Sequence, residues 1–283
     1  MLQASVNEAM RGGVQLAVPV ERHFDQSYAR EARSDDQERF TVDLSLAMAV
    51  QRQMLPRNTK QLPTTKYSGI SAASRGVGGD YYDFLDLGPN SLGLVLADVS
   101  GKGVGAALLM ANLQASIRCE CAHESRDLSA VLGRVHAHFF RSTLPAQYAT
   151  LFFGQYDERT RRLVYVNCGH QPAIIMRADG SVERLEATAL PLGLVAAWSC
   201  EVKIVELRSG DALYVYSDGV VEAGIENGCE FGEEGLISVI APDAEQDIET
   251  SVARIARAVR AYAPDGLTDD MTIVGLRVAS SQP

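Results

Sequence analysis

Acidic residues recur beside glycine or other turn-forming residues at the ends of predicted strands. The motifs are VGGDYYD, LADVSGKG, YSDGVVEA and TDDMT, which contain Asp80, Asp98, Asp218, Asp269 and Asp270. Carboxylates gathered in one place repel one another, so such a cluster persists only where protons or cations neutralise it. Because the motifs hold oxygen donors without histidine or cysteine, they favour Mg²⁺ or Mn²⁺ over Zn²⁺. The sequence therefore predicts a site for hard divalent cations.

Glycines accompany these acids at Gly78, Gly79, Gly101, Gly103 and Gly219. A glycine lets the backbone approach an ion or a phosphate where a Cβ atom would obstruct it. One Asp-Gly pair is most often an ordinary turn. Four acidic motifs, all at predicted strand ends, indicate more than turns.

A predicted hairpin explains how two of the acids meet. The strand-like segments DYYDFLDLG and SLGLVLADVS flank a GPNS turn at residues 88–91. With the turn centred near Pro89 and Asn90, Asp80 comes almost opposite Asp98. Side chains directly opposite each other in an antiparallel pair are neighbours. The hairpin therefore predicts two carboxylates side by side.

The remaining pattern predicts an α+β fold in layers. Helical spacing of apolar residues occurs at 106–122, 128–140 and 246–263. Further strand-like segments lie at 67–74, 148–157, 161–169, 171–178, 200–208, 211–218 and 271–278. Two helices after a hairpin, a meander of strands and a late helix argue against an alternating βαβ sheet.

The N-terminal part differs from the rest of the chain. Residues 1–40 mix charges of both signs with few large apolar groups, which predicts a solvated arm or connecting helix. Residues 40–55 then show helical spacing until Pro56. We predict an N-terminal arm and linker helix over 1–56 and a globular domain over 57–283. The apolar stripe of the linker either packs on its own domain or pairs with a second copy or an upstream module.

Composition narrows the functional classes. The formal net charge is -10, and the 26 Lys and Arg residues form no dense run, which argues against nucleic-acid binding. The N-terminus lacks the pattern of a signal peptide. No stretch approaches the ~18 continuous apolar residues of a membrane span. We therefore expect a cytoplasmic protein without a membrane span, unless the chain is part of a larger membrane-bound protein.

Taken in order, several motifs resemble one family. The segments VGGDYYDF, LADVSGKGVGAALLMA, YATLFFGQYD, YVNCGHQPAII, LPLGL, YSDGVVEA and DDMTIV are similar to those of PPM-type (protein phosphatase 2C-like) metal-dependent serine/threonine phosphatases, in the bacterial SpoIIE/RsbU-like branch. The resemblance covers about residues 66–278. It implies an αββα sandwich, two antiparallel sheets flanked by helices, with two divalent ions, manganese or magnesium.

The resemblance also implies roles for individual residues. It makes Asp98 the acid that bridges both ions, with the Val99 carbonyl as an adjoining ligand. Asp218 and Asp269 match acids on one ion. Asp80 matches an acid that contacts an ion or its bound water. These four aspartates are therefore the expected catalytic residues.

Other positions match the family pattern in part or depart from it. Asp270 stands where eukaryotic relatives carry Asn, so either it or Asp269 binds metal, and we favour Asp269. Gly79 replaces a glutamate, which predicts weaker binding of one ion. Arg75, five residues before the first acid, matches a phosphate-binding arginine. His170, in CGHQP, either contacts substrate as a proton donor or is a structural turn residue.

The implied reaction is hydrolysis of phosphoserine or phosphothreonine through attack by a water that bridges the metal ions. By the same resemblance, the substrate is a phosphorylated anti-sigma-factor antagonist, a STAS-domain protein of a partner-switching pathway. The family also implies a homodimer formed through the linker helix. The alternative is a catalytically weak or silent phosphatase fold that serves as a scaffold for a regulatory partner.

Three other superficial matches fail. GGDYY differs from the diguanylate cyclase signature because Tyr81 replaces the required acid. SGKGVG differs from a P-loop because Gly103 replaces the serine or threonine that would meet magnesium. Ser100 and His170 lack the G-x-S-x-G context of a hydrolase nucleophile.

Overall fold

A computed structural model describes residues 26–56, 60–122, 127–241 and 247–280. The chain divides into two compact units, Met1–Asp43 and Leu44–Pro283. Helix α1 (Gln26–Met54) begins in the first unit and ends in the second. The helix predicted at 40–55 is thus confirmed and begins earlier than its apolar pattern, within the charged segment. The part of the predicted arm before residue 26 lies outside the described residues.

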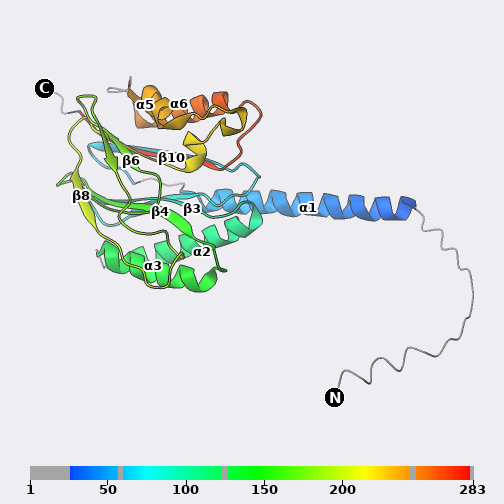
Figure 1. Cartoon of the computed structure of the whole chain (residues 1–283). Coiled ribbons are helices and arrows are strands. Elements are labelled where there is room, and N and C mark those ends of the chain that lie inside the picture. The colour runs from blue at the N-terminus through cyan, green and yellow to red at the C-terminus, as the bar shows by residue number, and fades with distance from the viewer. Residues whose placement is uncertain (1–25, 57–59, 123–126, 242–246, 281–283) are drawn as a thin grey trace, which may run out of the picture. The chain divides into compact units, whose positions relative to one another are not determined.

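Two antiparallel sheets of five strands each form the second unit (Figure 1). The first sheet has the strand order β1 (Thr65–Ala72), β10 (Met271–Val278), β9 (Ala212–Tyr216), β6 (Ala173–Met176) and β7 (Val182–Leu185). The second has the order β2 (Tyr81–Asp86), β3 (Ser91–Val99), β4 (Ala149–Asp157), β5 (Arg162–Cys168) and β8 (Lys203–Glu206).

Helices cover the outer face of each sheet (Figure 1). Helices α2 (Val104–Cys121) and α3 (Leu128–Ser142) pack on the second sheet, and α5 (Gly232–Ile240) and α6 (Ile248–Tyr262) pack on the first. The short helices α4 (Asp218–Val221) and η1 (Ile225–Asn227) follow β9. This αββα arrangement confirms the predicted fold class.

The core has three apolar layers, one between the sheets and one under each helical pair. Between the sheets, Leu94 and Phe152 of the second sheet belong to the same buried cluster as Leu213 of the first. Because both faces of the sheets are covered, β3 reads as a nearly continuous apolar run, SLGLVLADV. Besides the short helices α4 and η1, the elements β7 and α5 were not predicted from the sequence.

Each missed element has a weak local pattern. Strand β7, VERL, has two exposed residues among its four. Helix α5 is only 9 residues long and contains glycine at its first and fourth positions. Within the part of the chain that is described, no helix is both long and apolar enough to cross a membrane.

Candidate active site

The β2–β3 hairpin brings the first two acids together. Tyr81 pairs with Ala97 in this register, so Asp80, directly before β2, comes opposite Asp98, as the hairpin spacing predicted. Asp80 is buried, and its Oδ2 atom has no hydrogen-bond partner among the described residues. A buried carboxylate oxygen without a partner is unfavourable unless a proton or a cation satisfies it.

The first sheet supplies the other two acids at one edge. Asp218 is the first residue of α4, directly beyond β9, and Asp269 lies just before β10. Strands β9 and β10 are antiparallel neighbours, with Ile273 opposite Tyr216. The end of β9 and the start of β10 therefore lie side by side, and so do the segments that carry Asp218 and Asp269.

The four acids act as one electrostatic cluster. Burial, followed by repulsion from Asp218 and Asp269, raises the pKa of Asp98 to about 7. Burial and the charge of Asp269 raise the pKa of Asp218 to about 6. Burial and the charge of Asp98 raise the pKa of Asp80 well above its ordinary value. Carboxylates from both sheets thus oppose one another's ionisation.

This donor set fits a hard divalent cation. Its ligands would be carboxylate oxygens, one of which is buried and unpartnered. However, no group of three acidic, histidine or cysteine side chains is already arranged around a single point in the described part of the chain. The acids are neighbours, but their side chains would have to turn to complete a coordination shell.

One reason is that Asp269 already has a cationic partner. The Lys102 Nζ atom lies 2.6 Å from Asp269 Oδ2. The same ammonium group donates a hydrogen bond to the Thr268 carbonyl at 2.8 Å. Lys102 was not predicted as a site residue, although it stands in the SGKG segment, which begins two residues after Asp98.

Asp270 faces the loop that precedes Asp80. Its Oδ1 atom accepts hydrogen bonds from the Ser74 backbone N–H at 2.8 Å and the Ser74 hydroxyl at 3.0 Å. Its Oδ2 atom accepts the Gly79 N–H at 2.8 Å. Both oxygens thus tether the loop at residues 73–79. The preference for Asp269 over Asp270 as the metal ligand stays a prediction.

Several glycines around the site are required by contacts within the protein. A Cβ atom on Gly78 would lie 1.9 Å from Asp270 Oδ2, and one on Gly79 would lie 2.6 Å from the Val99 carbonyl oxygen. A Cβ atom on Gly219 would lie 2.1 Å from the Asp270 carbonyl oxygen. From the sequence, we expected these glycines to permit the approach of an ion or a phosphate. The structure shows that backbone and carboxylate oxygens of the chain itself occupy the space.

The end of α1 touches the same loop from within the second unit. Gln51 donates a hydrogen bond from Nε2 to the Gly78 carbonyl at 2.7 Å and accepts the Gly78 N–H on Oε1 at 3.1 Å. A cavity of about 310 Å³ lies beside this contact, with Met48 and Asp80 among its lining residues. Gln51 was not predicted as a site neighbour, because its partner is the backbone of Gly78.

The two predicted substrate-binding residues lie in contrasting environments. Arg75 is exposed in the tethered loop, next to Ser74. His170 is buried, and its Nδ1 atom lies 2.8 Å from the Thr150 hydroxyl. Thr150 lies on β4, opposite Asp98 of β3. Burial lowers the pKa of His170 to about 4, so the ring is neutral near pH 7. The ring thus contacts β4 beside Asp98, and the two roles suggested from the sequence, proton donor and structural turn residue, stay predictions.

Comparisons with known proteins agree with the fold. The family described as Stage II sporulation protein E (SpoIIE) matches residues 88–279. Protein IcfG of Synechocystis sp. (strain ATCC 27184 / PCC 6803 / Kazusa) is 27% identical over 263 residues, which are 83% of this chain and 41% of IcfG. Phosphoserine phosphatase RsbU of Bacillus subtilis (strain 168) is 26% identical over 250 residues, which are 85% of this chain and 71% of RsbU. The chain thus spans less than half of the length of IcfG.

Solved structures share the fold. The SiaA-PP2C domain of Pseudomonas aeruginosa superimposes with a TM-score of 0.74 at 23% identity, over 86% of this chain and 98% of that domain. The catalytic domain of the serine/threonine protein phosphatase PstP, solved in complex with 2 manganese ions, has a TM-score of 0.58 at 17% identity, over 77% of this chain and 99% of that one.

Proposed function

Because this chain belongs to the SpoIIE family of PP2C-type phosphatases, we propose that it is a metal-dependent serine/threonine protein phosphatase. The observation that carries the proposal is the cluster of Asp80, Asp98, Asp218 and Asp269, drawn from the adjoining ends of two packed sheets. Buried repulsive carboxylates are unfavourable for stability, which is typical of a site built for a cationic ligand.

The four aspartates, with the Val99 carbonyl, would hold divalent ions, either manganese or magnesium. The oxygen-only donor set and the likeness to PstP with its 2 manganese ions support a site for two such ions. When bound, the ions would supply Lewis-acid polarisation of a phosphoryl group and a water nucleophile at neutral pH.

The chain's own residues would orient the substrate. Arg75 projects from the loop that Asp270 holds against β10, and we propose that its guanidinium group binds a phosphate oxygen. The hydrogen bond from the Gly79 N–H to Asp270 fixes the loop relative to Asp80, because Gly79 directly precedes Asp80 in the chain. Orientation of the phosphate by this loop is a positioning effect rather than a chemical step.

For the substrate, we propose a phosphorylated STAS-domain anti-sigma-factor antagonist. The likeness to a relative named phosphoserine phosphatase RsbU supports a phosphoserine protein as substrate. The partner-switching pathway itself is an inference from the family resemblance.

We also propose that residues 1–56 act as an arm and linker helix that pairs two copies of the chain, with residues 57–283 as the catalytic domain. Leu46 and Val50 lie one turn apart on α1 and are 64% and 54% exposed. Phe40 and Val42, earlier in the helix, are also exposed. A single sedimenting species of monomer mass at high protein concentration would contradict the dimer.

The first experiment measures phosphate release from a small aryl phosphate and from a phosphoserine STAS-domain protein, with Mn²⁺, with Mg²⁺ and with chelator. We expect metal-dependent release that is lost in Asp98→Ala and Asp218→Ala. Asp179→Ala is the matched control, because Asp179 is bonded only within its own turn among the described residues. No release from a folded wild-type protein under either metal would favour the scaffold alternative.

A further inference from the structure

Lys102 occupies an unusual place among the acids. It stands on the turn between β3 and α2, four residues after Asp98, and Gly101 and Gly103 on either side have φ of 97° and 73°. Its Nζ atom lies 2.6 Å from Asp269 Oδ2. The positive charge of Lys102 also opposes the rise in pKa of both Asp98 and Asp218. The ammonium group therefore acts on the cluster as a whole.

Asp269 has little capacity left for another cation while this contact exists. Its Oδ1 atom accepts the Asp270 N–H at 2.8 Å, and its Oδ2 atom is the one bound to Lys102. An ammonium group and a divalent ion on the same carboxylate would repel each other strongly at such short range. This occupancy agrees with the lack of a ready-made three-ligand group among the described residues.

We propose that Lys102 is the built-in counter-ion of the metal-free acid cluster, and that a divalent cation displaces its ammonium group from Asp269. The inference rests on the cation site proposed above and adds a residue that regulates its affinity. The Lys102 side chain is 37% exposed, so the released ammonium group has access to solvent. Lys102 would thus be a positioning residue that acts through Asp269.

A contact present only in the metal-free state has two linked effects. It stabilises that state, and it weakens metal binding by the same factor. Because both partners are partly exposed, the effect is modest, and we expect about a two- to tenfold change in metal affinity. The change should shrink at high ionic strength, because salt screens exposed charges.

The test combines two measurements on Lys102→Met, which keeps the length of the side chain but removes its charge. Calorimetric titration with MnCl₂ alone should show binding that is about two- to tenfold tighter than in the wild type. Thermal unfolding in chelator at low salt should show a lower midpoint. Lys102→Arg, which retains the charge, should behave as the wild type in both measurements.

Lys60→Met is the matched control, because Lys60 Nζ also lies 2.6 Å from a carboxylate, that of Asp86 at the turn end of β2. It should lower the unfolding midpoint without changing Mn²⁺ affinity. If Lys102→Met lowers both stability and affinity, the lysine is a structural link to Thr268 and Asp269, and the proposal is overturned. Unchanged Mn²⁺ affinity would overturn it as well. Absence of Mn²⁺ binding to the wild type would instead overturn the proposed function.

Discussion

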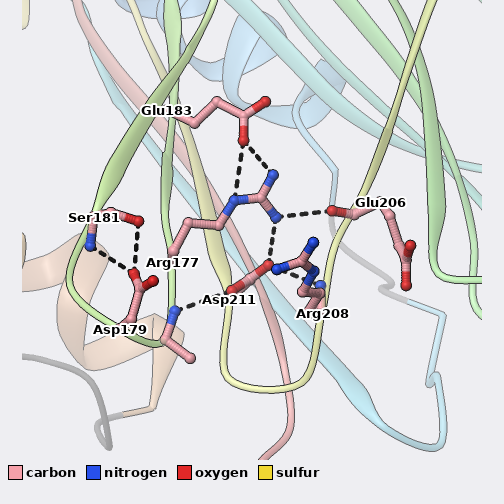
Figure 2. Close-up of polar contacts among 8 residues, drawn as sticks. Arg177, Asp179, Ser181, Glu183, Glu206, Arg208 and Asp211 are labelled. Atoms are coloured by element: carbon pink, nitrogen blue, oxygen red, sulfur yellow. Dashed lines mark hydrogen bonds and ion pairs between the residues drawn. The ribbon is translucent and has the colours of Figure 1, made fainter.

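Strand β9 has a buried or half-buried aspartate beyond each end, and the two side chains have opposite surroundings. Asp211, before the strand, accepts hydrogen bonds on Oδ2 from Arg177 Nη1 at 2.6 Å and the Arg208 N–H at 2.8 Å. Its Oδ1 atom accepts the Ala178 N–H at 3.0 Å (Figure 2). Asp218, beyond the other end, adjoins further carboxylates, and its pKa rises to about 6.

The difference separates a stabilising end of the sheet from a functional one. At the Asp211 end, Arg177 also contacts Glu183 and the Glu206 carbonyl, so charges and donors are matched (Figure 2). At the Asp218 end, the carboxylates outnumber the cationic side chains near them. Lys102, which pairs with Asp269, is the cationic contact described above. Sites that violate ordinary rules of charge pairing are typically functional.

Substitution of Asp98 should give the largest effect on activity. Asp98→Asn should reduce hydrolysis of a small aryl phosphate on the order of a thousandfold or more. Loss of a residue that only supports a metal ligand already lowers metal affinity or activity by about 10–100-fold. The metal-free variant should be at least as stable as the wild type, because a repulsive charge is removed. Aryl phosphatase assays and urea unfolding in chelator check both points. A variant that keeps more than a tenth of the activity would show that Asp98 does not bind the metal.

Substitution of Asp211 should give the reverse result. Asp211→Ala leaves Arg177 and two backbone N–H groups without their acceptor, and we expect a loss of about 3–5 kcal/mol in the free energy of unfolding. Activity per folded molecule should not change. Glu183→Ala, at the more exposed part of the same network, should cost about 1 kcal/mol or less. Equal losses for the two variants would remove the distinction between buried and exposed partners.

Asp270 should have an intermediate effect through the loop. Asp270→Ala removes the acceptors of Ser74 and Gly79, and should lower Mn²⁺ affinity by about 10–100-fold, as expected for an outer-shell support. Hydrogen exchange at residues 74–79 should become faster. Asp270→Asn, which retains one carbonyl acceptor, should be milder. If both variants lose Mn²⁺ binding completely, Asp270 is itself a ligand, and our preference for Asp269 is wrong.

The contrast between the two ends of β9 also shows which contacts could be predicted from the sequence. The pairing of Asp80 with Asp98 was predicted correctly because a short hairpin fixes its own register. The tether from Asp270 to Ser74 joins residues 196 positions apart, and its donors include backbone N–H groups that carry no residue-type signal. The Lys102–Asp269 pair and the Arg177–Asp211 pair likewise depend on which segments pack together. Contacts of this kind follow from the fold, and local patterns do not specify them.

The smallest expected effect is a pH dependence confined to the acidic end. Without metal, the pKa values of Asp98 at about 7 and Asp218 at about 6 exceed the ordinary value of about 3.9 in an unfolded chain. At a pH between about 3.9 and 7, these two carboxyl groups hold more protons in the folded state than in the unfolded state. Their contribution to stability is therefore greatest at low pH and falls as the pH rises through about 7.

Urea midpoints in chelator at pH 5 and pH 8 test this, with Asp98→Asn as the comparison. The wild type should lose more stability than Asp98→Asn over this interval, because the variant no longer carries the Asp98 carboxyl group, whose pKa is raised further than that of Asp218. Mn²⁺ should reverse the trend, because cations bind the deprotonated acids and protons compete with them. Equal pH dependence of wild type and variant would mean that the acids at this end are as well neutralised as Asp211 at the other.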